Sequence, residues 1–253
     1  MPEKDATNAG KKRRGTVVTV VVITIALVCF VFAMMNMFDV RIGDLQNSSS
    51  YRELAAKNFA GAKDSPEKLS SMFEKLRETN PDTVGWIDIP GTDISYPVVQ
   101  AEDNDFYRTH NFFKEENRGG AVFLDAQDHI GFTDENTVLY GQNMTDGSMF
   151  AALKNYQDKS FLSAHSTISI YLADGTAKDY RVFAAYIASD EGESFTDTFS
   201  SHGEFEKYVT AMKALSESES DVDVLGGKSI LTLSTCEKGE DTAKYIVQAV
   251  LHA

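Results

Sequence analysis

The sequence predicts a mainly β protein, in which one closed barrel of short strands is carried on a single membrane-spanning helix. A charge-free apolar run of about 20 residues lies near the N-terminus. From Val84 onward, short apolar runs alternate with turn residues, which is the pattern of strands. Amphipathic helices flank these runs, and short strands with helices at their edges favour a closed barrel over a parallel sheet.

The apolar run extends from Thr16 to Met35. A helix needs about 20 such residues to cross the hydrocarbon core, whereas a cleaved secretory signal has a shorter apolar region followed by a small-residue cleavage site. Residues 32–37 contain no such site. We therefore predict a transmembrane signal-anchor helix over residues 16–37.

The charges on either side of the run predict its orientation. Four basic residues at 11–14 precede it, and the mixed charges Asp39, Arg41 and Asp44 follow it. The positive-inside rule then places residues 1–15 in the cytoplasm as a basic tail. We expect a single-pass protein of the cell membrane whose C-terminal domain is extracytoplasmic.

Composition argues against several classes of partner. The net charge of −14 provides no excess of Lys and Arg for neutralising phosphates, so we expect no nucleic acid. No His, Cys, Asp and Glu have zinc-ligand spacing, and Asp103–Asp105 is too short for a calcium-binding EF-hand loop. No phosphate-cradling or dinucleotide-binding glycine motif occurs. We expect neither a metal nor a cofactor.

The segment at 38–65 is predicted to be an extracytoplasmic stalk. Residues 47–50 form a polar break, and residues 51–63 are rich in Ala, Glu and Lys, which favour a helix. The main folded domain is then predicted over residues 66–253.

That domain is predicted to begin with a helix, because Ser65 can cap it and Pro66 suits its first turn. Asn80-Pro81 ends this helix. A second amphipathic helix is predicted at 203–216. Apolar runs predict the strands, at 84–89, 94–99, 121–124, 137–140, 168–172, 180–187, 229–234 and 245–251.

Cys236 is the one thiol of the external domain, since Cys29 lies within the predicted span. Such a cysteine forms an intermolecular bridge, is a reactive thiol, or is buried and inert. Cys236 ends a strand-forming run, and Lys244 heads the next one. A cation near a thiol favours the thiolate, although the acidic residues of loop 237–241 oppose it.

Five ordered segments, together with the N-terminal anchor, resemble class B sortases, a family of cysteine transpeptidases. They cover roughly residues 66–251. The segments are TLSTC (232–236), NPDTVGWIDIPGTDISYPVVQ (80–100), YRTHNF (107–112), NTVLYGQNMTDGSMF (136–150) and the helix at 203–216.

The resemblance implies an eight-stranded sortase barrel and a specific reaction. A cysteine attacks a threonine carbonyl in the sorting signal of a secreted protein, which gives a thioacyl enzyme. An amine from a cell-wall precursor or a protein then resolves it, and the cargo is joined to the surface of a Gram-positive cell. In this family a histidine in a YGHNM-like motif is the general acid and base, and an arginine steadies the substrate carbonyl.

Cys236 matches the family's nucleophile, but two other positions differ. Gln142 stands at the histidine position, and Lys244 stands at the arginine position unless the alignment shifts by one residue to Tyr245. Gln142 cannot transfer a proton near neutral pH, and general acid–base catalysis is typically worth about 10²–10⁴-fold. Lys244 keeps the positive charge but loses the planar fork of arginine.

Three interpretations stay open. The chain is a working or slow sortase that transfers or hydrolyses its substrate, or a pseudosortase that binds sorting signals or a partner without turnover. Alternatively, Gln142 is a laboratory substitution that traps a substrate complex. Another histidine would have to replace the family's catalytic histidine. His129 is the candidate nearest in sequence to Gln142, and the other candidates are His110, His165, His202 and His252.

Overall fold

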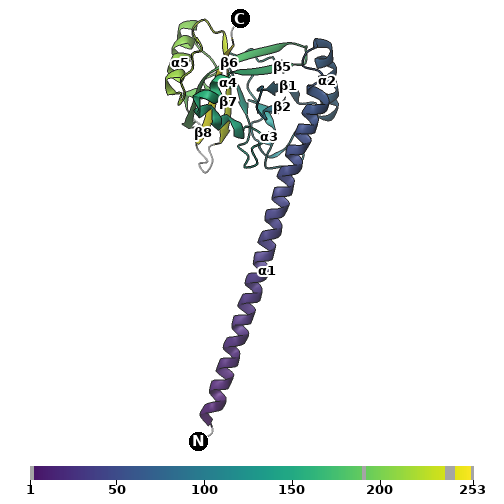
Figure 1. Cartoon of the computed structure of the whole chain (residues 1–253), viewed down its shortest axis with the longest axis vertical. Helices are drawn as coiled ribbons and strands as arrows, with labels where there is room; N and C mark the ends of the chain where they lie inside the picture. Colours follow the sequence, from purple (N-terminus) through teal and green to yellow (C-terminus); the bar gives the residue numbers. More distant parts are fainter. Residues whose placement is uncertain (1–2, 190–191, 237–242, 252–253) are drawn as a thin grey trace. The chain divides into compact units, whose positions relative to one another are not determined.

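The computed structural model describes residues 3–189, 192–236 and 243–251 (Figure 1). At Cys236, as in part of the N-terminal helix, it describes the backbone alone. The chain divides into two compact units, one ending at Leu45 and the other beginning at Gln46. The second unit contains the strands and the candidate site.

Within the described residues, eight strands close into one barrel in the order β1-β2-β3-β4-β7-β8-β6-β5. Neighbouring strands are antiparallel except for the parallel pairs β2–β3 and β4–β7. This confirms the expected eight-stranded closed barrel. The strands are β1 (Thr83–Asp88), β2 (Ser95–Val99), β3 (Val122–Leu124), β4 (Asn136–Tyr140), β5 (Thr167–Leu172), β6 (Ala177–Ser189), β7 (Ser229–Cys236) and β8 (Ala243–Leu251).

Helix α1 (Glu3–Leu54) continues through residues 47–50, so the predicted polar break there is wrong. The side-chain hydroxyls of Ser49 and Ser50 both donate to the carbonyl of Gln46, at 2.8 and 2.9 Å. Serine often competes with helical hydrogen bonds, but a hydroxyl that bonds to a carbonyl of the preceding turn is compatible with the helix. A π-helical turn, η1 (Ala55–Phe59), follows directly.

Two aromatic residues of the segment predicted as a stalk are buried in the core around the barrel. Phe59 stacks on the buried Trp86 of β1 with ring centroids 4.9 Å apart. The hydroxyl of Tyr51 donates to the carbonyl of Gly120 at 3.0 Å and accepts from the amide of Phe112 at 2.9 Å. Residues of this segment therefore belong to the compact unit.

No helix in the described part of the chain combines the length and the apolar character needed to cross a membrane. The membrane span over residues 16–37 is therefore unconfirmed and stays a prediction.

Two amphipathic helices pack on the barrel at opposite sides of the view in Figure 1. Helix α2 (Pro66–Thr79) contacts β1 and β5, and the side chain of Ser65 accepts from the amide of Lys68, which confirms the predicted cap. Helix α5 (His202–Leu215) packs on β6 and covers a second apolar cluster. The sequence predicts both helices because their buried residues recur at helical spacing.

Short helices fill the connections, and the sequence predicted none of them individually. They are α3 (Phe106–Thr109), η2 (Ala151–Gln157), α4 (Lys159–Ala164) and η3 (Glu193–Phe195). Of these, α3 begins where Oδ1 of Asp103 accepts from the amides of Asp105 and Phe106, at 3.0 Å each. Each is at most seven residues long, which is too short to show a clear helical period in the sequence.

A buried polar network joins three strands behind the site. The hydroxyl of Thr232 in β7 donates to Oδ1 of Asn136 in β4 at 2.7 Å, and Nε2 of Gln248 in β8 donates to the same hydroxyl at 3.1 Å. All three side chains are fully buried. Because an unpaired polar group is costly inside a protein, the network favours one register for β4, β7 and β8.

Candidate functional site

The site lies where three strands meet at one edge of the barrel. Since β4 and β7 run parallel, with Tyr140 opposite Ser234, their C-terminal ends lie at the same edge. Strand β8 begins at this edge, because Cys236 pairs with Lys244 in the antiparallel register of β7 and β8. The fold thus brings together the chain positions of Gln142, Cys236 and Lys244.

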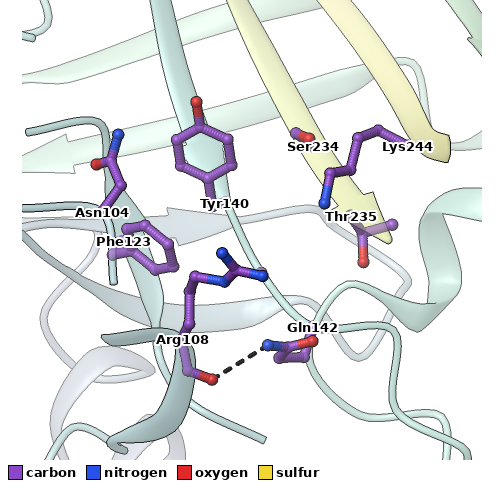
Figure 2. Close-up of a pocket in the computed structure, with 9 residues that line it drawn as sticks. Asn104, Arg108, Phe123, Tyr140, Gln142, Ser234, Thr235 and Lys244 are labelled. Atoms are coloured by element: carbon purple, nitrogen blue, oxygen red, sulfur yellow. Dashed lines mark hydrogen bonds between the residues drawn. The ribbon is translucent and has the colours of Figure 1, made fainter. Parts of the chain in front are cut away.

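A pocket of about 190 Å³ opens at this edge (Figure 2). Its lining comes from β3, β4, β7 and β8, and from the segments around α3 and after β4. The lining residues are Asn104, Arg108, Phe123, Tyr140, Gly141, Gln142, Ser234, Thr235 and Lys244.

The pocket distinguishes the two residues considered for the arginine position. Lys244 is half-buried and lines the pocket, and Figure 2 shows its ammonium group pointing inward. Tyr245 pairs with Thr235 and is fully buried in the barrel. The side chain of Cys236 and the acidic loop 237–241 lie outside the described residues.

Gln142 contributes its side-chain amide to a hydrogen bond with the backbone. Its Nε2 donates to the carbonyl of Arg108 at 3.1 Å, the bond drawn in Figure 2. The backbone carbonyl of Gln142 accepts from the amide of Phe150 at 2.9 Å. This residue therefore connects the segment after β4 to α3. A neutral amide does not exchange a proton with substrate near pH 7.

Gly141 allows the close turn that places Gln142 at the pocket. Its amide donates to the carbonyl of Ser234 at 3.1 Å, which continues the β4–β7 pairing past the end of β4. A Cβ atom at this position would lie 2.7 Å from the ring of Phe150. We expect any larger residue at position 141 to displace the aromatic ring or the strand end.

Arg108 is a pocket residue that the sequence did not predict. Figure 2 shows its guanidinium group pointing into the pocket from α3. Among the described residues its ion-pair partner is Asp105, whose Oδ1 lies 3.6 Å from Nη1, and both side chains are largely exposed. A pair this long and exposed contributes little to stability, so the guanidinium retains the capacity to bind another group.

One wall of the pocket is rigid and polar. The hydroxyl of Tyr140 and Nδ2 of Asn104 both donate to Oδ2 of Asp125, at 2.9 Å each. The Tyr140 ring stacks on Phe123 with centroids 5.2 Å apart. Because two side chains donate to the same carboxylate oxygen, this network orients Tyr140.

Behind this wall lies a carboxyl group with a perturbed pKa. Burial, and to a smaller extent the nearby carboxyl groups of Asp125 and Asp134, raise the pKa of Asp128 to about 7. The amide of Val138, which donates to Oδ2 of Asp128 at 2.6 Å, opposes this increase. Asp128 does not line the pocket. We therefore expect its titration to change the stability of this wall and not to act on a group that reacts in the pocket.

Two buried hydroxyl groups at the end of β7 have no hydrogen-bond partner among the described residues. They belong to Ser234 and Thr235, which are 1% and 3% exposed and both line the pocket. Leaving such groups unpaired is unfavourable, and native structures rarely do so.

The described lining of the pocket is positively charged. Arg108 and Lys244 belong to it, whereas no Asp, Glu or His among the described residues does. This contrasts with the net charge of −14 for the whole chain. The pocket therefore favours an anionic group or a developing negative charge.

None of the described histidines lines the pocket. A backbone carbonyl lies beside the ring of His110 and of His165, a backbone amide donates to the ring of His129, and Glu206 lies one helical turn from His202. His252 lies outside the described residues. Within the described part of the chain, no group of three His, Cys, Asp or Glu residues is arranged to hold a metal ion.

A family model described as "Sortase domain" matches residues 87–252. Two curated relatives are similar to the chain. Sortase B of Listeria monocytogenes is 40% identical over 178 residues, which cover 70% of this chain and 72% of the relative. Sortase B of Staphylococcus aureus is 31% identical over 230 residues, which cover 90% of this chain and 93% of the relative.

Solved structures agree with these matches. A Staphylococcus aureus sortase B–substrate complex superposes with a TM-score of 0.76 at 30% identity, and the match covers 83% of this chain and 98% of that one. Clostridium perfringens sortase B superposes with a TM-score of 0.66 at 33% identity, covering 72% of this chain and all of that one. The similarity thus includes both the barrel and the strands that form the pocket.

Proposed function

Because this chain belongs to the sortase family, we propose that it functions as a class B sortase, a cysteine transpeptidase acting on secreted proteins that carry a sorting signal. The thiolate of Cys236 attacks a threonine carbonyl of the signal. The carbon–nitrogen bond then breaks, and the acyl part of the substrate stays on the sulfur. An amine of a cell-wall precursor or a protein attacks this thioester, which forms a new amide and releases Cys236.

One observation supports this proposal above the others: Cys236 pairs with Lys244 at the mouth of a positively charged pocket. Attack on a carbonyl places negative charge on its oxygen. A cation held by the neighbouring strand is well placed to stabilise that charge, as oxyanion-binding donors do in other acyl-transfer enzymes.

Gln142 limits the rate in this proposal. A thiol near its ordinary pKa is a few per cent thiolate at pH 7, so Cys236 retains some nucleophile. The leaving amine must also gain a proton, and Gln142 cannot donate one. We expect a rate about 10²–10⁴-fold below that of an enzyme with a positioned acid and base.

The membrane anchor is part of the same proposal. Residues 16–37 cross the membrane, residues 1–15 stay in the cytoplasm, and the barrel faces the secreted substrates outside. The apolar run and the basic residues before it support this arrangement. Protease protection in sealed vesicles tests it, because only inverted vesicles should leave the barrel protected.

The Gln142–Arg108 hydrogen bond also favours a second candidate function. The side-chain amide of Gln142 holds α3 beside the pocket, which supports the binding of a ligand, but this amide cannot transfer a proton. In this alternative the chain is a pseudosortase, which binds a sorting signal or a partner and does not cleave it. A fold can outlast the loss of its chemistry.

Cleavage of a library of fluorogenic sorting-signal peptides separates the two functions. The full chain in detergent is compared with Gln142→His and with Cys236→Ala. Cleavage by the unaltered chain that Cys236→Ala abolishes supports the enzyme. Binding of a peptide without cleavage, together with cleavage by Gln142→His alone, supports the pseudosortase. No cleavage and no peptide binding by any variant contradicts both.

A further inference from the structure

Arg108 brings a charged group with several hydrogen-bond donors into the pocket. Figure 2 shows its guanidinium pointing inward from α3. Its ion-pair partner among the described residues is Asp105, whose carboxylate lies 3.6 Å from Nη1 and whose side chain is 86% exposed. Water and salt weaken a pair that is so long and so exposed. A carboxylate that enters the pocket can therefore compete with Asp105 for the guanidinium.

The backbone around Arg108 is held by two other segments. The carbonyls of the residues before and after it accept from the amides of Ala121 and Asn117, at 3.0 and 2.7 Å. The carbonyl of Arg108 itself accepts from Nε2 of Gln142 at 3.1 Å. The side chain thus extends from a restrained backbone, which lowers the entropy that is lost when the guanidinium binds a partner.

The polar side chains next to Arg108 are bonded within the protein. Nδ2 of Asn104 donates to Asp125 at 2.9 Å, and Oδ1 of Asn104 accepts from the amide of Ala126 at 2.8 Å. The hydroxyl of Tyr140 donates to the same carboxylate at 2.9 Å. These groups build the wall of the pocket. On this wall of the described lining, Arg108 is the residue that offers charged donors to a ligand.

The surroundings of the guanidinium suit an acidic side chain. No Asp or Glu occurs among the described residues of the lining, so these residues do not repel a carboxylate. The ring of Phe123, stacked on Tyr140, provides an apolar surface for methylene groups. Arginine binds a carboxylate through two parallel N–H bonds, and a neutral amide cannot match this interaction in strength.

Resting on the proposed binding of a sorting signal at this pocket, we propose that the signal carries an acidic residue close to its threonine and that Arg108 binds the carboxylate of this residue. Lys244, which is expected to face the attacked carbonyl, lines the same pocket of about 190 Å³. So small a pocket places the acidic residue near the threonine in the peptide. Arg108 then determines specificity and takes no part in acyl transfer.

Fluorescence anisotropy with matched peptide pairs tests this recognition. The probes are dansyl-labelled hexapeptides with a fixed threonine and an amidated C-terminus, so that a side chain supplies the only carboxylate. Each peptide with Glu at one position beside the threonine has a partner with Gln there. The full chain in detergent carries Cys236→Ala, which prevents turnover of the bound peptide.

We expect the Glu member of at least one pair to bind about tenfold more tightly than its Gln partner, because two charged hydrogen bonds replace neutral ones. Added salt should reduce this ratio. Arg108→Gln should abolish the preference, and Arg108→Lys should keep part of it, since lysine has the charge without the planar fork. Arg181→Gln is the matched control, because this exposed arginine lies opposite Val250, at the end of β8 away from Lys244.

Three results would overturn the proposal. The first is a ratio near one for every pair with the unaltered pocket. The second is a preference that survives Arg108→Gln, since another group would then bind the carboxylate. The third is an equal loss of the Glu and Gln peptides in Arg108→Gln, which would assign Arg108 a structural role. Thermal unfolding of each variant establishes that it is folded.

Cleavage of the same pairs by the chain that retains Cys236 separates this inference from the proposed enzyme. A preference for Glu that depends on Arg108, in a chain that cleaves no peptide, upholds the inference and contradicts the enzyme. Cleavage of both members of each pair at equal rates, with equal binding, upholds the enzyme and contradicts the inference. Binding of no peptide contradicts both.

Discussion

The side-chain amide of Gln142 donates to the backbone carbonyl of Arg108 at 3.1 Å, across two segments that are distant in sequence. Glutamine forms this hydrogen bond as a neutral amide, which neither gains nor loses charge near neutral pH. Gln142 therefore stands where the family has a proton-transferring histidine, and its amide holds the backbone of Arg108, whose side chain is permanently charged.

Substituting histidine for Gln142 should raise peptide cleavage by about 10²–10⁴-fold, because an imidazole near its ordinary pKa can accept and donate the proton that the reaction transfers. The pH dependence should also become bell-shaped. Steady-state cleavage of a fluorogenic peptide measures both effects. The control is Gln127→His, which places a histidine on an exposed surface position. An unchanged rate in Gln142→His would show that a different step limits turnover.

Lys244 should stabilise the negative charge on the attacked carbonyl oxygen. Lys244→Gln removes the charge and should lower kcat/KM by about 10²–10³-fold, the cost of losing one oxyanion donor. Lys244→Arg keeps the charge and adds a planar pair of donors, so its kcat/KM should equal or exceed that of the unaltered chain. Lys228→Gln is a matched control, since this exposed lysine precedes β7 at the end away from Cys236. Equal activity of Lys244→Gln and the unaltered chain contradicts this role.

Phe59 should contribute to the stability of the barrel, because its ring stacks on the buried Trp86. Phe59→Ala should lower the free energy of unfolding by about 3–5 kcal/mol, the usual effect of removing a buried aromatic ring. Lys57→Ala, in the same π-helical turn but exposed, should change it by less than about 0.5 kcal/mol. Urea unfolding of the full chain in detergent measures both. Equal effects of the two variants would mean that this turn does not pack on the barrel.

The carboxyl group of Asp128 should make stability depend on pH. Burial raises its pKa in the folded state to about 7, so the folded chain holds a proton that the unfolded chain releases at lower pH. The resulting stabilisation is complete below the ordinary pKa of aspartate and is lost as pH rises towards 7. Relative to Asp128→Asn, the unaltered chain should lose about 1–2 kcal/mol between pH 5 and 7.5, after allowance for its partial exposure. Parallel stability curves in urea unfolding would contradict the raised pKa.

Local signals predicted the elements whose determinants are adjacent in sequence. Ser65 and Pro66 mark the start of α2, and the structure has the serine cap and the helix start there. Strand β7 was expected from the run before Cys236, and it ends at that cysteine. Both features depend on neighbouring residues, so a single sequence is enough to predict them. The pattern of short strands favoured a closed barrel, but the pairing of eight strands depends on distant contacts, and the family resemblance supplied that expectation.

Other features depend on contacts that no local pattern encodes. The sequence of residues 51–63 favours a helix, but nothing in it indicates that Phe59 would meet Trp86. Arg108 lies in the YRTHNF segment, to which the sequence analysis assigned no site residue, and its presence in the pocket depends on the contact between α3 and the segment after β4. The presence of both Arg108 and Lys244 in one pocket is a property of the tertiary fold. A basic residue near a family motif would be the one sequence signal for it.

The most direct test of the central claim is intact-mass analysis of the full chain after incubation with a sorting-signal peptide and no amine acceptor. If Cys236 is a working nucleophile, the chain should gain the mass of the acyl part of the peptide, and hydroxylamine should remove it because it cleaves thioesters. Cys236→Ala should gain no mass, and Gln142→His should gain it faster. No adduct on the unaltered chain, with a peptide that acylates Gln142→His, would contradict the claim that this chain is an active sortase.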